Sequence, residues 1–184
     1  RQNGSRTIVH YRDLPELTFD DFPVNACENV DWFHFEGRNV SAMTKMLEHV
    51  LAHRIDQPIS LELEKQRPGL EELARNADLV MFSHAYAQEA GFEDAAEFLA
   101  SMRAGLPDCL ISLTWGSEGA WYCGPKWPIT RVPAKRIANV VDTIGAGDSY
   151  NAGLIDALSC GSPLPEAIEA ACRLAEKKIQ KQGL

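Results

Sequence analysis

The sequence predicts an α/β protein whose mostly parallel sheet is covered by helices on both faces. Segments of strand character alternate with segments of helical periodicity, and several of the strand segments are near-continuous apolar runs. After Gly116 the pattern changes to short runs that are typical of antiparallel strands at one edge of a sheet. The length of 184 residues fits one domain, or a large part of one, with a buried core.

The elements follow from the local patterns along the chain. Strands are predicted at 7–11, 30–37, 59–63, 78–83 and 109–114, and the stretches AWYC and ITRVPA form the antiparallel edge. Helices are predicted at 40–54, 69–76, 85–90, 93–104, 147–159 and 165–181. A stretch rich in Pro, Asp and Asn, from Asp13 to about Asn29, is predicted to be a loop. The lysines near the end of the last helix, Lys177, Lys178 and Lys181, favour its negative C-terminal end.

Composition and charge narrow the classes of function. A 45% hydrophobic and 24% charged chain is typical of a globular protein, and the net charge of −8 argues against binding nucleic acid or an anionic membrane. No apolar run approaches the roughly 20 residues that span a bilayer, and the first residues lack a signal-peptide pattern. The five cysteines are scattered without CxxC spacing, so we expect reduced thiols in a cytoplasmic protein.

The stretch VVDTIGAGDSYNAG at 140–153 combines a glycine-rich turn, an acid and the start of a helix. Such a turn exposes backbone N–H groups that, together with the helix dipole, form a site for an anion such as a phosphate. Gly145, Ala146 and Gly147 are the predicted anion-binding amides, and Asp148 is the candidate base that takes a proton from an attacking hydroxyl. For an isolated GAGD, a helix cap after a flexible turn is an equally good explanation of Asp148.

Longer motifs decide between these explanations. DTIGAGDSYNAG (142–153) resembles the C-terminal signature of the ribokinase-like (PfkB) carbohydrate kinases, and TWGSEGA (114–120) resembles their nucleotide-holding strand and turn. AACRLAEKKIQKQGL (170–184) resembles their last helix. The stretches NGSRTIVHY, FHFEGRN and LELEK narrow the resemblance to the ketohexokinase branch of the family. The resemblance implies a ribokinase-like three-layer α/β/α fold with a mostly parallel sheet, without the family's N-terminal part and most of its lid.

The resemblance also implies the reaction, which is transfer of phosphate from ATP, with Mg²⁺, to the 1-hydroxyl of a ketohexose such as fructose. In this family Asp148 matches the catalytic base, and the amides of 145–147 match the anion hole. The matching nucleotide-binding residues are Arg6, Gly116, Ser117, Gly119 and Cys172. Asp142 and Thr143 match a site for a monovalent cation such as K⁺, and a homodimer is implied for the full-length protein.

Two departures from the family affect the expectations. Ser5 stands where ketohexokinases have an Asn that contacts the sugar. The NxxE motif that many relatives use near Mg²⁺ is replaced by Ser-His-Ala-Tyr at 83–86, which fits the ketohexokinase branch. The chain also begins inside what would be a central strand of the family fold. We therefore expect a partial kinase domain, with 1–12 as a remnant of the strand and lid region and 30–184 as the nucleotide-binding part. Such a fragment is not expected to phosphorylate fructose by itself.

Other functions remain open at this point. The chain is alternatively another PfkB member, such as a ribokinase or nucleoside kinase, or a nucleotide-binding fragment without catalytic activity.

Glu36 and Arg38 lie at a strand's end, where a functional role and a structural ion pair are equally compatible with the sequence. His49 and His53 lack a third ligand nearby, so a helix-surface pair is expected rather than a zinc site.

Overall fold

A single mixed sheet forms the centre of the protein. The computed structural model describes residues 13–183, so the predicted strand at 7–11 and Arg6 lie outside the described residues. The strands lie side by side in chain order from β1 to β6. They comprise β1 Phe33–Glu36, β2 Ile59–Leu63, β3 Leu79–Phe82, β4 Leu110–Thr114, β5 Ala120–Gly124 and β6 Trp127–Val132. The pairs from β1 to β4 are parallel, whereas β4–β5 and β5–β6 are antiparallel, which confirms the predicted edge.

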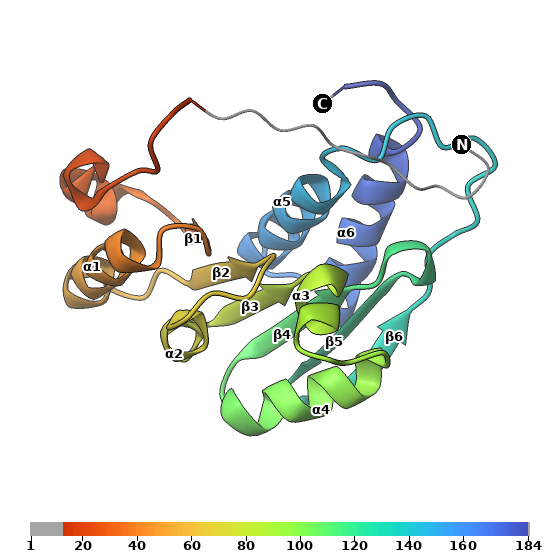
Figure 1. Cartoon of the computed structure of the whole chain (residues 1–184), viewed down its shortest axis with the longest axis horizontal. Coiled ribbons are helices and arrows are strands. Elements are labelled where there is room, and N and C mark those ends of the chain that lie inside the picture. The colour runs from red at the N-terminus through yellow and green to blue at the C-terminus, as the bar shows by residue number, and fades with distance from the viewer. Residues whose placement is uncertain (1–12, 184) are drawn as a thin grey trace.

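Helices cover both faces of this sheet (Figure 1). One face carries α1 Val40–His53, α2 Leu70–Ala74, α3 His84–Glu89 and α4 Ala95–Gly105, and the other carries α5 Ala146–Ser159 and α6 Leu164–Lys178. Two separate hydrophobic clusters match the two faces, one built on residues such as Leu61 and Phe98 and the other on Met81 and Leu154. Because strand residues alternate between the faces, neighbouring residues of β3 contribute to different clusters. The predicted three-layer α/β/α architecture is confirmed.

The helix α5 is tied to the sheet near its first turn. The hydroxyl groups of Tyr150 and Ser112, both buried, lie 2.7 Å apart and form a hydrogen bond between α5 and β4. Two buried hydroxyl groups that pair in this way satisfy each other, so this geometry fixes the helix start against the sheet. The Tyr150–Ser112 pair therefore sets where the residues before it meet the ends of the strands.

The segment from Asp13 to Asn29 is more ordered than the predicted loop. It contains two short 3₁₀ helices, η1 Phe19–Asp21 and η2 Val24–Asn29. Thr18 caps η1, since its amide and its hydroxyl both donate to the Asp21 carboxylate at 2.8 Å. Short 3₁₀ turns have no apolar periodicity of their own, which is why sequence patterns did not indicate them.

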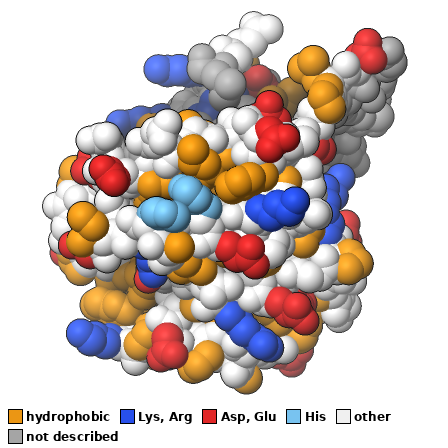
Figure 2. Space-filling view, turned by 90° about the vertical axis from the view of Figure 1, so that its left-hand side faces the viewer, with side chains coloured by type: hydrophobic (Ala, Val, Ile, Leu, Met, Phe, Trp, Pro, Cys, Tyr) orange, Lys and Arg blue, Asp and Glu red, His pale blue; other side chains and the backbone are white. Residues whose placement is uncertain are grey.

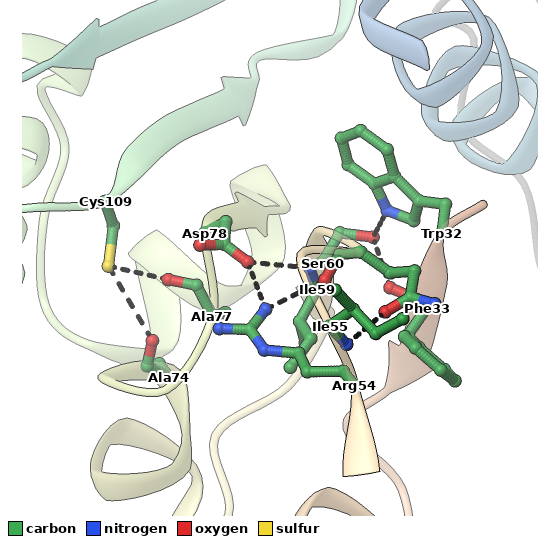
Figure 3. A network of polar contacts seen from close by, with 11 residues as sticks. Trp32, Phe33, Arg54, Ile55, Ile59, Ser60, Ala74, Ala77, Asp78 and Cys109 are labelled. Atoms are coloured by element: carbon green, nitrogen blue, oxygen red, sulfur yellow. Dashed lines mark hydrogen bonds and ion pairs between the residues drawn. The ribbon is translucent and has the colours of Figure 1, made fainter. Parts of the chain in front are cut away.

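A polar network holds the amino ends of the parallel strands (Figure 3). The carboxylate of Asp78, just before β3, accepts the Ile59 amide at 2.8 Å and pairs with Arg54 at 2.8 Å. The Cys109 thiol, just before β4, donates to the carbonyl oxygen of Ala77 at 3.1 Å. These hydrogen bonds join the loops at the amino ends of the strands. The cavity described below lies at the opposite, carboxyl ends.

Candidate active site

The carboxyl ends of the parallel strands surround a cavity of about 530 Å³. The strands β1 to β4 contribute residues at or just after their ends, and α5 contributes its first turns; the lining includes Glu36, Glu62, Ser83, Thr114, Gly116, Thr143, Gly145, Gly147, Asp148 and Asn151. Ligands of open α/β sheets bind at this end of the strands. The cavity thus brings together four strand ends and the glycine-rich turn that the sequence singled out.

The turn before α5 has the backbone conformation that glycine permits. Gly145 immediately precedes the helix and has φ +76° and ψ +6°, in the left-handed region that other residues rarely adopt. The amide of Ala146 donates to the Thr143 carbonyl at 3.3 Å, so this amide already has a partner within the turn. The turn is therefore closed by one internal hydrogen bond.

The amides of Gly145 and Gly147 have the features of an anion site. Among residues 13–183, neither amide donates a hydrogen bond to a protein acceptor. A Cβ atom placed on Gly147 would meet nothing within 4 Å, so open space lies next to the backbone at this point. Free amides at a helix N-terminus beside open space fit a phosphate group. Of the three predicted amides, the structure leaves two available and engages Ala146.

Asp148 follows directly in the first turn of α5, with an exposed side chain that lines the same cavity. Asp148 does not cap this helix, because the residue at the N-cap of α5 is Gly145. Asp148 thus lies in the same cavity lining as the two free amides of Gly145 and Gly147. The arrangement suits a base that acts on a hydroxyl close to that phosphate.

A second carboxyl group lies in the cavity beside Asp148. Glu62 on β2 is partly buried, and this burial raises its pKa to about 7, with the nearby carboxylates of Glu36 and Asp148 adding to the rise. A hydrogen bond with the side chain of Asn151, itself buried, works in the opposite direction and lowers the pKa. The sequence around β2 did not indicate this burial. The burial depends on α5, which is distant in the sequence and packs next to the end of the strand.

Glu36 and Arg38 at the end of β1 form an ion pair that is about half exposed on both sides. Both residues also line the cavity, together with Arg67, whose guanidinium donates to the Gly37 carbonyl at 2.8 Å. Of the two alternatives that the sequence left open for Glu36 and Arg38, the ion pair is present, and it lies at the cavity wall. An exposed pair of this kind contributes little to stability.

The predicted nucleotide turn is a short 3₁₀ helix, η3 Gly116–Glu118, between β4 and β5. Gly116 lines the cavity, whereas Ser117 and Gly119 do not. Gly119 has φ +103°, and a Cβ atom there would lie 2.1 Å from the Val132 carbonyl oxygen of β6. Close backbone packing therefore requires a glycine at position 119, whether or not a nucleotide binds there.

Cys172 lies on α6 and packs in the same hydrophobic cluster as Tyr150, but it is not among the residues that line the cavity. Its thiol is half-buried against the hydrophobic cluster of α5 and α6, and burial raises its pKa to about 11. The thiol is therefore protonated at neutral pH and acts as a packing group in this structure. Arg6, the remaining predicted nucleotide residue, lies outside the described residues.

At the predicted cation site of Asp142 and Thr143, a positively charged side chain of the protein, Lys178, contacts Asp142. The ammonium of Lys178 lies 3.3 Å from the Asp142 carbonyl oxygen and 3.5 Å from its carboxylate. These are the oxygen atoms of Asp142 that would ligate K⁺, so the arrangement in this structure does not fit a second cation there.

Metal binding by the protein alone has little support among the described residues. Between residues 13 and 183 no group of three or more His, Cys, Asp or Glu side chains is placed to hold a metal ion. The stretch at 83–86 begins α3 instead, where the Ser83 hydroxyl accepts the Tyr86 amide at 3.0 Å. Mg²⁺ often binds proteins mainly through substrate phosphates, so we treat it as part of the MgATP substrate.

The histidine pair lies at the surface near the β1 edge of the molecule. His49 and His53 stack with ring centroids 4.1 Å apart, and His49 also contacts the Phe22 ring. Figure 2, viewed from the side on the left of Figure 1, shows histidine side chains among hydrophobic ones on this face. Both residues are carried by α1, and within the described part of the chain no third His, Cys, Asp or Glu joins them in a group that could hold a metal ion.

The comparisons with known proteins decide the family. The family model described as pfkB family carbohydrate kinase matches residues 1–184. The chain belongs to the PfkB carbohydrate kinase family. Ketohexokinase of Mus musculus is 36% identical over 189 residues, which cover 98% of this chain and 63% of that protein. Fructoselysine 6-kinase of Escherichia coli K12 is 38% identical over 72 residues, or 39% of this chain and 24% of that protein.

Solved structures show the same PfkB fold. Adenosine kinase from Sinorhizobium meliloti matches with a TM-score of 0.78 and 25% identity, over 91% of this chain and 54% of that one. Ribokinase from Thermotoga maritima matches with a TM-score of 0.73 over 91% of this chain and 56% of that one, and at 16% identity it shows the fold alone. The chain thus spans less than two thirds of these relatives' lengths. Among the described residues, no helix has the length and apolar character needed to cross a membrane.

Proposed function

We propose that this chain carries the phosphoryl-transfer site of a ketohexokinase-type sugar kinase, which moves the γ-phosphate of ATP to the 1-hydroxyl of a ketohexose such as fructose. The observation that supports this most is the cavity at the carboxyl ends of the strands. There Asp148 lies in the same lining as the amides of Gly145 and Gly147, which have no acceptor among the described residues. A base beside an anion site is what phosphoryl transfer to an alcohol needs.

In the proposed step, Asp148 accepts the proton of the sugar hydroxyl while the hydroxyl oxygen forms a bond to the γ-phosphorus. The bond from this phosphorus to the β,γ-bridging oxygen breaks, and ADP leaves with the bonding electrons. The amides of Gly145 and Gly147 donate to the oxygens of the moving phosphoryl group and stabilise its charge. The Mg²⁺ that arrives with ATP neutralises phosphate charge; no metal ligand is assigned to the protein.

The nucleotide is proposed to lie on the side of the η3 turn. Gly116 supports this because it lines the same cavity as Asp148. Ser117, Gly119, Cys172 and Arg6 stay predictions for the nucleotide, the first three because they lie outside the lining. Thr143 lines the cavity next to Gly145, but K⁺ at Thr143 and Asp142 is left out of the proposal because Lys178 contacts Asp142.

The choice of a ketohexose rests on the sequence likeness to mouse ketohexokinase, which extends over 98% of this chain. A second candidate is a kinase for a ribose-containing substrate, favoured by the likeness to the adenosine kinase structure at 25% identity and a TM-score of 0.78. The shorter likeness to a fructoselysine 6-kinase agrees with a ketose-derived substrate. Identity over the larger part of the chain favours the ketohexose.

The test compares the products of the complete gene product with MgATP and fructose, ribose or adenosine. We expect a product with fructose, and a phosphorus-to-C1-proton coupling in its NMR spectrum that places the phosphate on carbon 1. Phosphorylation of adenosine or ribose with none of fructose would favour the second candidate. ATP binding without phosphate transfer to any of the three acceptors would contradict the proposed kinase activity and favour a protein that only binds nucleotide.

Two further properties belong to this proposal. All five cysteines are free thiols in the structure, which supports a reducing location such as the cytoplasm.

A homodimer of the complete gene product is proposed from the family resemblance, and light scattering of the purified protein tests it. A monomer at micromolar concentration would contradict the dimer without bearing on the reaction.

A further inference from the structure

The last residue of α6, Lys178, carries a buried positive charge. Its side chain is only 7% exposed, and its ammonium lies 3.5 Å from the Asp142 carboxylate and 3.3 Å from the Asp142 carbonyl oxygen. Lysine is almost never buried unless it is paired, because the loss of hydration costs several kcal/mol per ion. The position of this side chain is therefore set by Asp142, which lies 36 residues earlier in the chain.

Asp142 in turn shapes the turn that leads to the free amides. One carboxylate oxygen accepts the Ile144 amide at 2.9 Å, and the other accepts the Gly183 amide at 3.3 Å. The Ile144 amide and the nearby Lys178 charge are among the causes that lower the pKa of Asp142, so the carboxylate is ionised at neutral pH. A carboxylate that bonds to the amide two residues ahead fixes a compact turn, here directly before Gly145.

The backbone adds a second link between the same two segments. The amides of Val141 and Asp142 both donate to the Ile179 carbonyl oxygen, at 2.7 Å and 3.2 Å. The end of α6 and the segment before α5 are thus joined by main-chain bonds on one side and by the Lys178–Asp142 pair on the other. The backbone bonds fix the place of the segment, and the ion pair fixes the orientation of the Asp142 side chain that forms the turn.

We propose that Lys178 is a positioning residue of the phosphate site, acting through Asp142 on the amides of Gly145 and Gly147. The inference rests on the proposed function, in which these amides hold the transferred phosphoryl group. Lys178 does this in two ways. It holds the Asp142 carboxylate where it can bond the Ile144 amide, and it neutralises a negative charge that would otherwise repel a phosphate a few residues away.

The neighbouring Lys177 provides a matched control. It also lies in the last turn of α6, but its side chain is exposed. Replacing either lysine by methionine removes one positive charge from the same helix end. A difference between K177M and K178M therefore reports the buried contact with Asp142 rather than the general charge of the protein.

The experiment measures the affinities of the complete gene product for MgATP and for adenosine by calorimetry. Adenosine lacks the phosphates, so the difference between the two ligands isolates the contribution of the phosphate site. We expect K178M to bind MgATP about tenfold more weakly and adenosine as the wild type does, and K177M to match the wild type with both ligands. Wild-type MgATP affinity in a folded K178M would overturn the proposal.

Two other outcomes separate this proposal from a structural role and from the proposed function. Equal losses for MgATP and adenosine in K178M, with a lowered Tm, would mean that Lys178 only supports the fold, and this overturns the positioning role. A wild-type protein that binds MgATP no more tightly than adenosine would remove the phosphate site itself, and with it the proposed function. In that case the positioning role of Lys178 is overturned together with the proposed function.

A second pair of variants and a second measurement cover a K178M protein that fails to fold. K178R keeps the charge, so we expect its MgATP affinity within about threefold of the wild type, whereas D142N is expected to lose about tenfold. In amide NMR spectra, MgATP is expected to shift the Gly145 and Gly147 signals in the wild type and K178R but much less in D142N. Equal shifts and affinities in D142N and the wild type would overturn the proposal.

Discussion

Glu62 and Asn151 join the end of β2 to the second turn of α5 by a hydrogen bond between their side chains. Asn151 lies three residues after Asp148, so the two project from neighbouring positions on α5. Glu62 thus sits beside the candidate base without being part of the glycine-rich motif. The partly buried acid also has a measurable consequence for stability.

The first prediction concerns the pH dependence of stability. The pKa of Glu62 is raised from 4.5 to about 7, so the folded protein binds a proton more tightly than the unfolded chain between these values. The stabilisation is therefore full below about pH 4.5 and is lost as the pH rises through 7, a change on the order of 1–3 kcal/mol. We expect E62Q to show a smaller loss of unfolding free energy than the wild type between pH 5 and pH 8.

Denaturant unfolding at the two pH values measures this difference. The matched control is E97Q, which removes an exposed carboxylate on α4 that neither lines the cavity nor affects the pKa of Glu62. E97Q should keep the wild-type loss. If E62Q and the wild type lose the same free energy between pH 5 and pH 8, Glu62 does not titrate as the structure indicates.

The second prediction contrasts two glycines. A Cβ atom at Gly147 would meet open space, whereas one at Gly119 would lie 2.1 Å from the Val132 carbonyl oxygen. We expect G147A to keep its stability, or gain up to about 1 kcal/mol from the higher helix propensity of Ala, while weakening MgATP binding because the methyl group occupies the phosphate site. G119A should lose about 2–4 kcal/mol.

Thermal unfolding and calorimetric titration with MgATP separate the two effects. Each glycine serves as the control for the other, since one variant should lose binding and the other stability. A G147A protein with wild-type MgATP affinity would argue against phosphate binding at the backbone of this turn.

The third prediction tests how α5 is held. Tyr150 and Ser112 satisfy each other in the interior through a bond of 2.7 Å. Y150F and S112A each leave one buried hydroxyl group without its partner, and each should lower the free energy of unfolding by about 1–2 kcal/mol. The double variant should cost less than the sum of the two, with a coupling of about 1 kcal/mol. Strictly additive losses would mean that the hydrogen bond contributes nothing.

The fold was predictable because its elements have strong local patterns. The helix beginning at Val40 and the apolar strands around Leu61 and Val80 agree with their predicted ranges within about three residues. The 3₁₀ turns before Asn29 were not predicted, since they depend on a few side-chain contacts such as Thr18 with Asp21. Local hydrophobic periodicity contains no information of that kind.

The candidate site was only partly predictable. Asp148 and the glycines before it form a contiguous motif, so the sequence placed them together, and the cavity contains them. Lys178 was interpreted as a partner of the helix dipole, because nothing local shows that its side chain turns back to Asp142. The burial of Glu62 likewise depends on α5, which lies far along the chain. Contacts between distant segments follow from packing, which the local pattern does not specify.

The measurement that tests the central claim most directly is the turnover of D148N in the complete gene product with MgATP and fructose, together with its MgATP affinity. D156N is the control, because it removes an exposed carboxylate from the same helix outside the cavity. We predict that D148N loses about 10²–10⁴-fold in kcat, the range for a general base, while its MgATP affinity stays within about threefold of the wild type and D156N is unchanged. Near-normal turnover by D148N would contradict the assignment of Asp148 as the base.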